Sequence, residues 1–190
     1  MKALEERILK DGQVLPGHVL KVGGFLNHQI DAPFMMDMGR EVARLFEGEK
    51  PTKILTVEAS GIAFGLAVAA AMGLPLVFGK KNKTSNVNAD VYSAAVHSYT
   101  HNVDNLVIVS KEYLKEGDRV LIVDDFLANG CALRGLMEIV AQAGAVTVGC
   151  ATAIEKGFQG GGDALRAEGV RVESLAIVEE MSDTTLTFRR

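Results

Sequence analysis

The chain has 190 residues, a mass of 20.3 kDa and a formal net charge of −4, and 48% of its residues are hydrophobic. This composition excludes a disordered chain, and the length fits one α/β domain spanning residues 1–190. The negative charge and the lack of an apolar run of membrane-spanning length argue against nucleic-acid and membrane partners. Because the N-terminus is charged and the two cysteines form no metal-binding or disulfide pattern, we expect a cytoplasmic protein.

The first half of the chain predicts a small N-terminal region followed by a strand–helix–strand unit. Asp31 is a favourable N-cap, and Pro33 suits the first turn of the helix that follows it. In order, the expected elements are a helix over 3–10, a strand over 19–22, the helix opened by Asp31, a strand over 53–57, a helix over 61–72 and a strand over 75–78. The last three predict a right-handed parallel crossover.

Polar residues, including several lysines, dominate the segment between Gly79 and Asp90. So long a polar excursion is typical of a lid, although an ordinary solvated loop is the alternative. The elements expected after it are an antiparallel strand pair over 91–99 and 106–110, a strand over 119–123, a helix over 133–143, a strand over 146–154, a helix over 163–168 and a last strand over 170–178. This order predicts an α/β fold with a central, mainly parallel sheet flanked by helices.

The segment from Val120 to Gly130 carries the strongest chemical pattern in the chain. Four aliphatic residues, typical of a strand buried on both faces, lead into Asp124 and Asp125. We expect these carboxylates at the carboxyl end of the strand, where open α/β sheets bind ligands. The small residues 128–132 then bring backbone N–H groups to the start of a helix, a geometry that holds a phosphate. Carboxylates beside it suit sugar hydroxyls or hydrated Mg²⁺, so the pattern predicts a ribose phosphate site, with a solvated strand end as the alternative.

This segment resembles the 5-phospho-α-D-ribose 1-diphosphate (PRPP) signature of the type I phosphoribosyltransferases: a hydrophobic strand, two acids, two hydrophobic residues, Ala, a small polar residue and Gly. It departs from the commonest form, with Asn129 in place of threonine, Cys131 in place of glycine and Ala132 in place of a hydroxyl residue. With fewer hydroxyls, the backbone amides from Ala128 through Gly130 to Ala132 must contribute more to binding the 5′-phosphate. The variant is similar to the bacterial branch that acts on xanthine, along almost the whole chain. The resemblance implies the family fold, with a flexible loop or hairpin and a small N-terminal hood.

A second anion-binding turn is expected between the strand over 53–57 and the helix over 61–72. Ser60 and Gly61 can offer backbone amides to an anion there, although Ser60 could equally be a plain N-cap. The resemblance implies that this turn is the pyrophosphate loop and that Lys81 reaches the pyrophosphate, often that of a neighbouring subunit. One molecule with a 5′-phosphate and a pyrophosphate would occupy both turns.

Two remote segments are expected to recognise a purine base. Lys156 ends a strand at the same sheet edge as the acidic pair and can donate to a 6-oxo group, while Phe158 offers a ring for stacking. A surface lysine and an inward-packed aromatic ring are the alternatives. The resemblance implies that Leu20 and Asn27 line the purine pocket, where an amide can donate to the 2-oxo group that separates xanthine from hypoxanthine. For Asn27, a turn residue beside His28 remains the alternative.

The resemblance implies a purine salvage enzyme that transfers the 5-phosphoribosyl group of PRPP to N9 of xanthine, giving XMP and pyrophosphate. Asp124 and Asp125 would hold the ribose diol and face the developing positive charge, with Lys81 as the third catalytic residue. Mg²⁺ is expected to be carried by PRPP and pyrophosphate without a direct protein ligand, and the chain to form a homodimer. Two alternatives stay open: a preference for guanine, hypoxanthine or adenine, and a non-catalytic regulator of the same fold that senses PRPP or purines.

Overall fold

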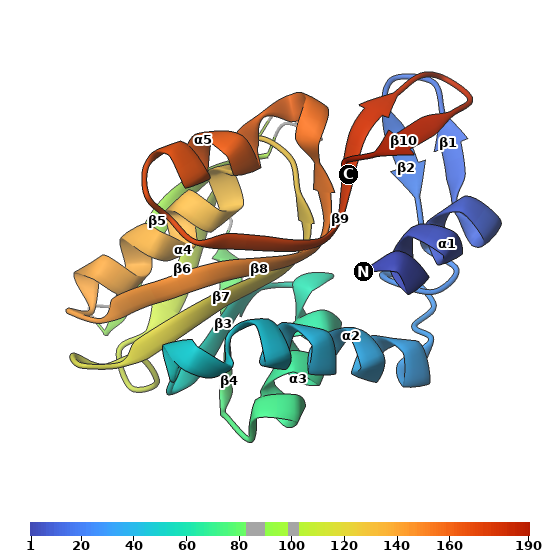
Figure 1. The fold of residues 1–190 in the computed structure, drawn as a ribbon. Helices are drawn as coiled ribbons and strands as arrows, with labels where there is room; N and C mark the ends of the chain where they lie inside the picture. Colours follow the sequence, from blue (N-terminus) through green and yellow to red (C-terminus); the bar gives the residue numbers. More distant parts are fainter. Residues whose placement is uncertain (83–89, 99–102) are drawn as a thin grey trace.

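A computed structural model describes residues 1–82, 90–98 and 103–190. Within these residues, eight strands form one sheet in the order β10-β9-β8-β7-β3-β4-β6-β5 (Figure 1). The strands are β3 (Lys53–Val57), β4 (Leu76–Asn82), β5 (Val91–Ser98), β6 (Val103–Ser110), β7 (Arg119–Leu127), β8 (Val146–Lys156), β9 (Val172–Met181) and β10 (Leu186–Phe188). The five strands from β9 to β4 are parallel, whereas β10, β6 and β5 are antiparallel to their neighbours.

Helices cover both faces of this sheet, and the alternation of side chains along β7 explains why. Leu121 and Val123 belong to a core shared with α2 (Ala32–Leu45) and α3 (Gly61–Met72). Val120 and Ile122 point to the opposite face, into a core shared with α4 (Cys131–Gln142) and α5 (Gly161–Ala167). A strand buried on both faces reads as a continuous aliphatic run, which is why the sequence shows no polar alternation here.

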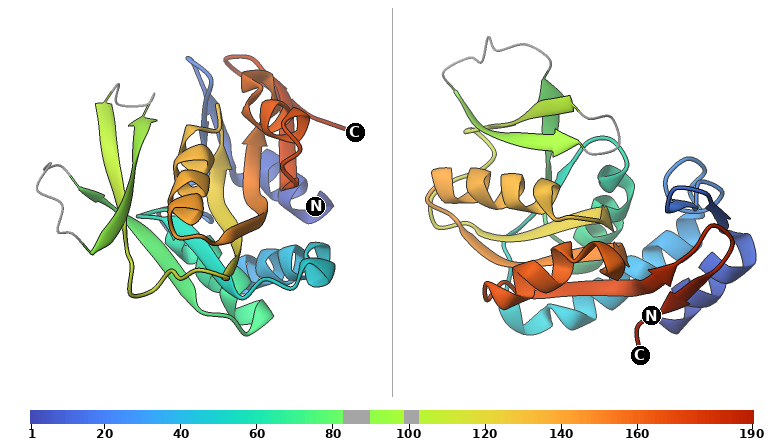
Figure 2. Two further views of the ribbon diagram at one scale, coloured as in Figure 1. Left: turned by 90° about the vertical axis from the view of Figure 1, so that its left-hand side faces the viewer. Right: turned by 90° about the horizontal axis from the view of Figure 1, so that it is seen from above.

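The N-terminal hood comprises residues 2–31: helix α1 (Lys2–Asp11), the hairpin of β1 (Gln13–Leu15) and β2 (Val19–Lys21), and the segment leading to α2. The hood lies at one end of the sheet beside β10, as the views in Figures 1 and 2 agree. Phe25 and Leu26 are fully buried and join the same core as α2. Asp31 closes the segment as an N-cap, because its carboxylate accepts a hydrogen bond from the Phe34 N–H at 3.2 Å. The hood is therefore anchored on the main core.

Most of the expected elements are confirmed, including the parallel crossover through α3 and the antiparallel pair of β5 and β6. The prediction that the strand over 170–178 is the last one is wrong, because β10 follows β9 and pairs with it antiparallel. Strands β1 and β10 have three residues each, too few for periodicity to show, and depend on their pairing partners. Strand β4 continues through the polar residues to Asn82, pairing with β6, so the first residues of the expected lid, 80–82, belong to a strand. The central residues of the lid, 83–89, lie outside the described residues.

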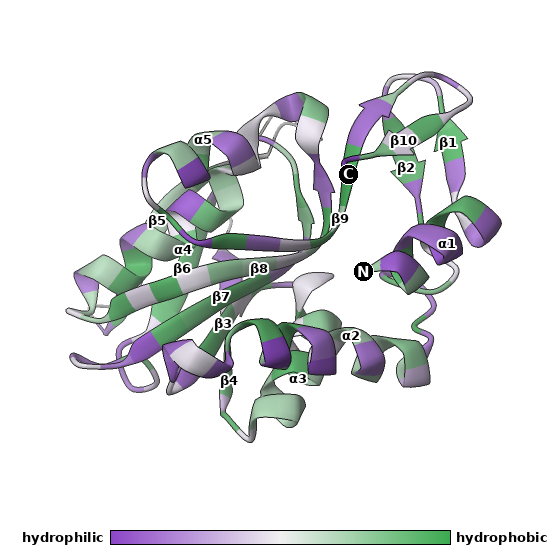
Figure 3. Cartoon of the chain, in the orientation of Figure 1, coloured by the Kyte–Doolittle hydropathy of each residue, from purple (hydrophilic) through white to green (hydrophobic). Residues whose placement is uncertain are grey.

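Hydropathy follows this layered arrangement. In Figure 3 the central strands carry mainly hydrophobic colours, while hydrophilic residues mark the outer sides of α2 and α1. Across the ranges that the structure describes, no helix combines the length and the apolar character needed to cross a bilayer.

Candidate active site

The acidic pair lies at the cleft end of the central strand β7. Asp124 and Asp125 are 6% and 5% exposed, and the four preceding aliphatic residues are completely buried. The sequence placed the pair just beyond the strand, but β7 continues to Leu127 because Phe126 and Leu127 still pair with β8. Both carboxylates are therefore held on a regular, paired backbone rather than on a loop.

Asp125 receives hydrogen bonds from two other segments of the chain. Ser60 Oγ donates to Oδ1 at 2.9 Å, and Asn27 Nδ2 donates to Oδ2 at 3.0 Å. The turn after β3, the end of β7 and the hood thus converge on one carboxylate. Donors on both oxygens orient a buried carboxylate and offset the cost of its burial.

Asp124 lies in a different electrostatic environment. Burial and the adjacent Asp125 charge raise its pKa well above the ordinary value, although a hydrogen bond from the Asp125 N–H at 3.0 Å and the positive charge of Lys81 act in the opposite direction. Asp124 therefore holds a proton more readily than an exposed carboxylate does. A sugar hydroxyl or a cation at this position would stabilise the charged form.

The small residues after the acidic pair form a tight turn into α4. Gly130 adopts a left-handed conformation, with φ 86°, and the helix begins at Cys131. Asn129 Oδ1 accepts a hydrogen bond from the Cys131 N–H at 3.1 Å, so one amide at the helix start is capped by a side chain of the same turn. An anion that uses this amide would have to displace Asn129. We call residues 128–132 the phosphate cup below.

A cleft of about 200 Å³ opens over the acidic pair and the phosphate cup. Its lining joins the end of β7 and the start of α4 to the turn after β3 and to β4 and β6. The predicted site residues in this lining are Ser60, Lys81, Asp124, Asp125, Ala128, Asn129, Gly130, Cys131 and Ala132. The fold thus brings both expected anion-binding turns and the acidic pair to one cleft.

The turn between β3 and α3 is not a simple N-cap. The Ser60 side chain makes no cap hydrogen bond to its own helix and binds Asp125 instead. Gly61 is required by close approach, because an added Cβ would lie 2.3 Å from Thr56 Oγ1 and 2.8 Å from Asp124 Oδ1. The same turn holds Lys81, whose backbone N–H donates to Glu58 Oε1 at 2.8 Å. Sequence reasoning gave no role to Thr56 or Glu58, and only the packing around the turn reveals one.

The four residues expected to recognise a base lie outside the lining of this cleft as far as the described residues go. Asn27 nevertheless touches it through Asp125, so it is more than a turn residue. Leu20 is 7% exposed and packs in the main core. Lys156 Nζ donates to the His18 carbonyl at 2.9 Å, and the Phe158 ring centroid lies 5.4 Å from that of His18. The end of β8 therefore meets the hood. Lys156 is not a free surface lysine: burial lowers its pKa.

Comparison with known proteins now defines the relationship. The family described as "Phosphoribosyl transferase domain" matches residues 28–165. The xanthine phosphoribosyltransferase of Bifidobacterium adolescentis is 53% identical, with complete coverage of both chains. The chain belongs to the phosphoribosyltransferase family. The xanthine phosphoribosyltransferase of Alkaliphilus metalliredigens is 51% identical to this phosphoribosyltransferase, covering 100% of this chain and 94% of its own.

Solved structures confirm the fold of this phosphoribosyltransferase. The adenine phosphoribosyltransferase of Giardia lamblia, complexed with 9-deazaadenine, superimposes with a TM-score of 0.76 at 21% identity, covering 92% of this chain and 96% of its own. That of Thermoanaerobacter pseudethanolicus gives a TM-score of 0.73 at 24% identity, covering 92% and 98%. The expected type I fold is therefore correct.

Proposed function

We propose that this phosphoribosyltransferase acts in purine salvage, transferring the 5-phosphoribosyl group from PRPP to N9 of xanthine with release of pyrophosphate. The observation that carries the proposal is full-length similarity, at 51–53% identity, to xanthine phosphoribosyltransferases from several bacteria. Similarity over the whole length includes the hood and the end of β8, the two regions that would contact a base. The adenine enzymes are alike in fold at far lower identity, which favours an oxopurine.

The cleft geometry supports the PRPP half of the proposed site. The phosphate cup, from Ala128 to Ala132, binds the 5′-phosphate, and Asp124 and Asp125 hold the ribose hydroxyls. Ser60 and Gly61 present the second anion-binding turn to the pyrophosphate, with Lys81 as the cation beside it. A helix N-terminus contributes only about 0.3–1 kcal/mol to anion binding, so the leaving group needs these additional charges.

Mg²⁺ fits this site as a metal brought by its substrate. The carboxylates that line the cleft belong to Glu58, Asp124 and Asp125, and among the described residues no cluster of three or more metal-binding side chains is present. Carboxylate oxygens suit Mg²⁺, which keeps several other oxygen ligands from substrate and water. The metal would neutralise charge on the pyrophosphate, while Asp124 and Asp125 face the positive charge that develops on the ribose.

The base half of the site uses the hood and the end of β8. Leu20 and Phe158 supply apolar contact, Lys156 donates to the 6-oxo group and Asn27 to the 2-oxo group. In the free protein the Asn27 amide is bound to Asp125 and the Lys156 ammonium to the His18 carbonyl. Both donors are therefore paired and oriented before a base arrives. An oxopurine would exchange these hydrogen bonds for its own, whereas an analogue lacking an oxo group would leave a donor unpaired.

The test is pyrophosphate release by the purified protein with PRPP, Mg²⁺ and xanthine, guanine, hypoxanthine or adenine in turn. We expect the highest kcat/KM with xanthine and XMP as the product. A higher kcat/KM with another base would mean that the proposed reaction is correct but that this other base is the preferred substrate. PRPP binding without pyrophosphate release from any base would favour the regulator of the same fold.

The same proposal places the chain in the cytoplasm as a homodimer of single-domain subunits. The subunit is expected to span residues 1–190 as one domain, with Lys81 near the boundary between subunits. Light scattering after size-exclusion chromatography measures the assembly directly. A mass of about 20 kDa, that of one chain, would contradict the dimer.

A further inference from the structure

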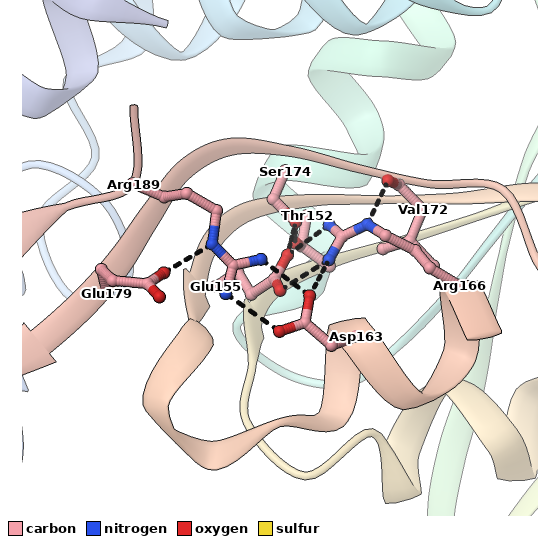
Figure 4. Close-up of polar contacts among 8 residues, drawn as sticks. All are labelled: Thr152, Glu155, Asp163, Arg166, Val172, Ser174, Glu179 and Arg189. Atoms are coloured by element: carbon pink, nitrogen blue, oxygen red, sulfur yellow. Dashed lines mark hydrogen bonds and ion pairs between the residues drawn. The ribbon is translucent and has the colours of Figure 1, made fainter.

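Glu155 carries a fully buried carboxylate at the end of β8, one residue before Lys156. Arg166 of α5 donates two hydrogen bonds to it, at 2.9 Å to Oε1 and 2.6 Å to Oε2, and Ser174 of β9 donates a third (Figure 4). Burying a carboxylate is costly even beside a guanidinium that stays 30% exposed, and such an ion pair is weak evidence for stability by itself. Stability alone therefore does not explain why this pair lies beside a proposed base-binding residue.

The ion pair of Glu155 and Arg166 continues into a network of alternating charge. Arg166 also donates to Asp163 at 3.1 Å, and Arg189 donates two hydrogen bonds to the same carboxylate, at 2.7 and 2.9 Å. Arg189 in turn pairs with Glu179 of β9, as Figure 4 shows. The hydrogen bonds of Arg189 lower the pKa of Asp163, which keeps this carboxylate charged. We call these five residues, from Glu155 to Arg189, the charge network.

The charge network borders a segment whose own sequence favours no single conformation. Residues 157–162 contain four glycines, and α5 has only seven residues. Helices this short do not form without tertiary contacts, and glycines add conformational freedom that must be lost on folding. The position of Phe158 therefore depends on what binds the two ends of the segment. Glu155 binds it at one end, and Asp163 and Arg166 bind it at the other.

The α5 end of the same segment also contacts the phosphate cup. The Gly161 N–H donates to the Ala128 carbonyl at 3.2 Å. An added Cβ at Gly161 would lie 2.3 Å from that carbonyl oxygen and 2.6 Å from the Gly130 nitrogen, so α5 begins in direct contact with the cup. The segment from Lys156 to α5 thus spans the distance between the proposed base contacts and the proposed phosphate contacts.

We propose that Glu155 and Arg166 are positioning residues that set the affinity for the purine base by fixing the Lys156–Phe158 segment against the phosphate cup. This inference rests on the proposed function. Neither residue touches the base. Their ion pair determines where the Lys156 ammonium and the Phe158 ring lie, whereas the cup itself is also held by β7 and α4. Loss of the pair should consequently weaken xanthine binding more than PRPP binding.

The main test is Glu155→Gln, which keeps the shape of the side chain and removes its charge. We expect KM for xanthine to rise about tenfold, the size expected for disturbing one hydrogen bond to a charged group, with KM for PRPP and kcat changed far less. Arg189→Gln acts on the exposed part of the same network, so it should fold normally and shift KM for xanthine in the same direction by a smaller factor.

The matched control is Glu168→Gln. It removes the ion pair in which Arg134 donates two hydrogen bonds to Glu168, at 2.6 and 2.8 Å, just after the end of α5. This pair has the same chemistry and borders the same helix, but among the described residues no side-chain hydrogen bond or ion pair joins it to the charge network. KM for xanthine should stay at the wild-type value.

Hydrogen–deuterium exchange provides a readout that does not need activity. Amides of residues 156–162 should exchange faster in Glu155→Gln and Arg189→Gln than in wild type and Glu168→Gln. A uniform loss of thermal stability with an unchanged KM for xanthine would overturn the inference, as would equal rises in both KM values. If Glu155→Gln does not fold, the KM values and the hydrogen–deuterium exchange of Arg189→Gln test the inference instead. A wild-type protein inactive with every base would contradict the proposed function, while the exchange data would still report on the network.

Discussion

The proposed contacts to the ribose and its 5′-phosphate come from one continuous segment, whereas the proposed base contacts join segments that are far apart in the chain. The acidic pair and the phosphate cup lie within nine consecutive residues, 124–132, between β7 and α4. By contrast, Lys156 meets His18 across 138 positions, and Asn27 meets Asp125 across 98. A local segment presents its chemistry wherever the strand and helix form. A site assembled from distant segments exists only after the sheet and the hood have packed.

The largest effect should come from Asp125→Asn, because it changes the carboxylate where the two sets of contacts meet. Activity should fall by on the order of 100-fold or more, as charge facing the developing positive ribose is lost. The melting temperature should change little by comparison. Asp183→Asn, at an exposed turn before β10, is the control and should leave both quantities unchanged. A parallel loss of activity and stability would make Asp125 a structural residue.

Gly61→Ala tests how tightly the turn after β3 packs against the acidic pair. The new methyl group would approach Thr56 Oγ1 and Asp124 Oδ1 to within 3 Å, so one of them must move. We expect destabilisation of about 1–3 kcal/mol, the usual cost of overpacking, together with a raised KM for PRPP. Gly48→Ala is the matched control, because a Cβ there meets nothing within 4 Å. Equal behaviour of the two variants in denaturant unfolding would show that the turn is loosely packed.

Asn27→Ala tests the proposed base contacts in the same manner. The preference for xanthine over hypoxanthine should fall by about tenfold or more, because the amide that favours the 2-oxo group is gone. Gln29→Ala removes a neighbouring side-chain amide that donates to the Gly24 carbonyl, at 3.3 Å, and should keep the wild-type ratio. An unchanged ratio of kcat/KM values in Asn27→Ala would remove this residue from base recognition.

The smallest effect concerns stability and its dependence on pH. The pKa of Asp124 is raised by burial and by the Asp125 charge, so its contribution to stability is complete below the unfolded-state pKa, near 4, and is lost as pH rises through the folded-state pKa. Asp124→Asn should therefore be more stable than wild type at neutral pH, by on the order of 1 kcal/mol, and equal to it at acidic pH.

Asp118→Asn should change the stability at neutral pH in the opposite direction. The pKa of Asp118 is lowered because hydrogen bonds from the Lys53 side chain and the Lys115 N–H outweigh the effect of burial. Its stabilisation is present above the unfolded-state pKa and is lost as pH falls through the folded-state pKa. This variant should be less stable than wild type at neutral pH. Urea unfolding from pH 4 to pH 8 measures both differences, and the same sign in both variants would contradict the account.

Residues whose role depends on neighbours in the chain were the ones that the sequence could predict. The buried run before Asp124 predicted the central strand, and the small residues after it predicted the start of α4. A helix cap and the two ends of a helix depend on a few neighbouring residues. The N-cap Asp31 and the boundaries of α3 were therefore also predicted correctly. The extension of β4 was not, because its polar end becomes a strand only by pairing with β6.

The sequence by itself determined the parallel α/β fold, the acidic pair and the glycine-containing turns, because each follows from side-chain periodicity or from backbone chemistry at adjacent positions. Tertiary structure alone decided that Ser60 binds Asp125 rather than its own helix, that Asn27 reaches the same carboxylate, and that Glu155 is buried against Arg166. Each of these contacts joins segments separated by loops whose closure no local pattern encodes. They form because burying two cores brings the segments together, and a polar group carried inside must find a partner there.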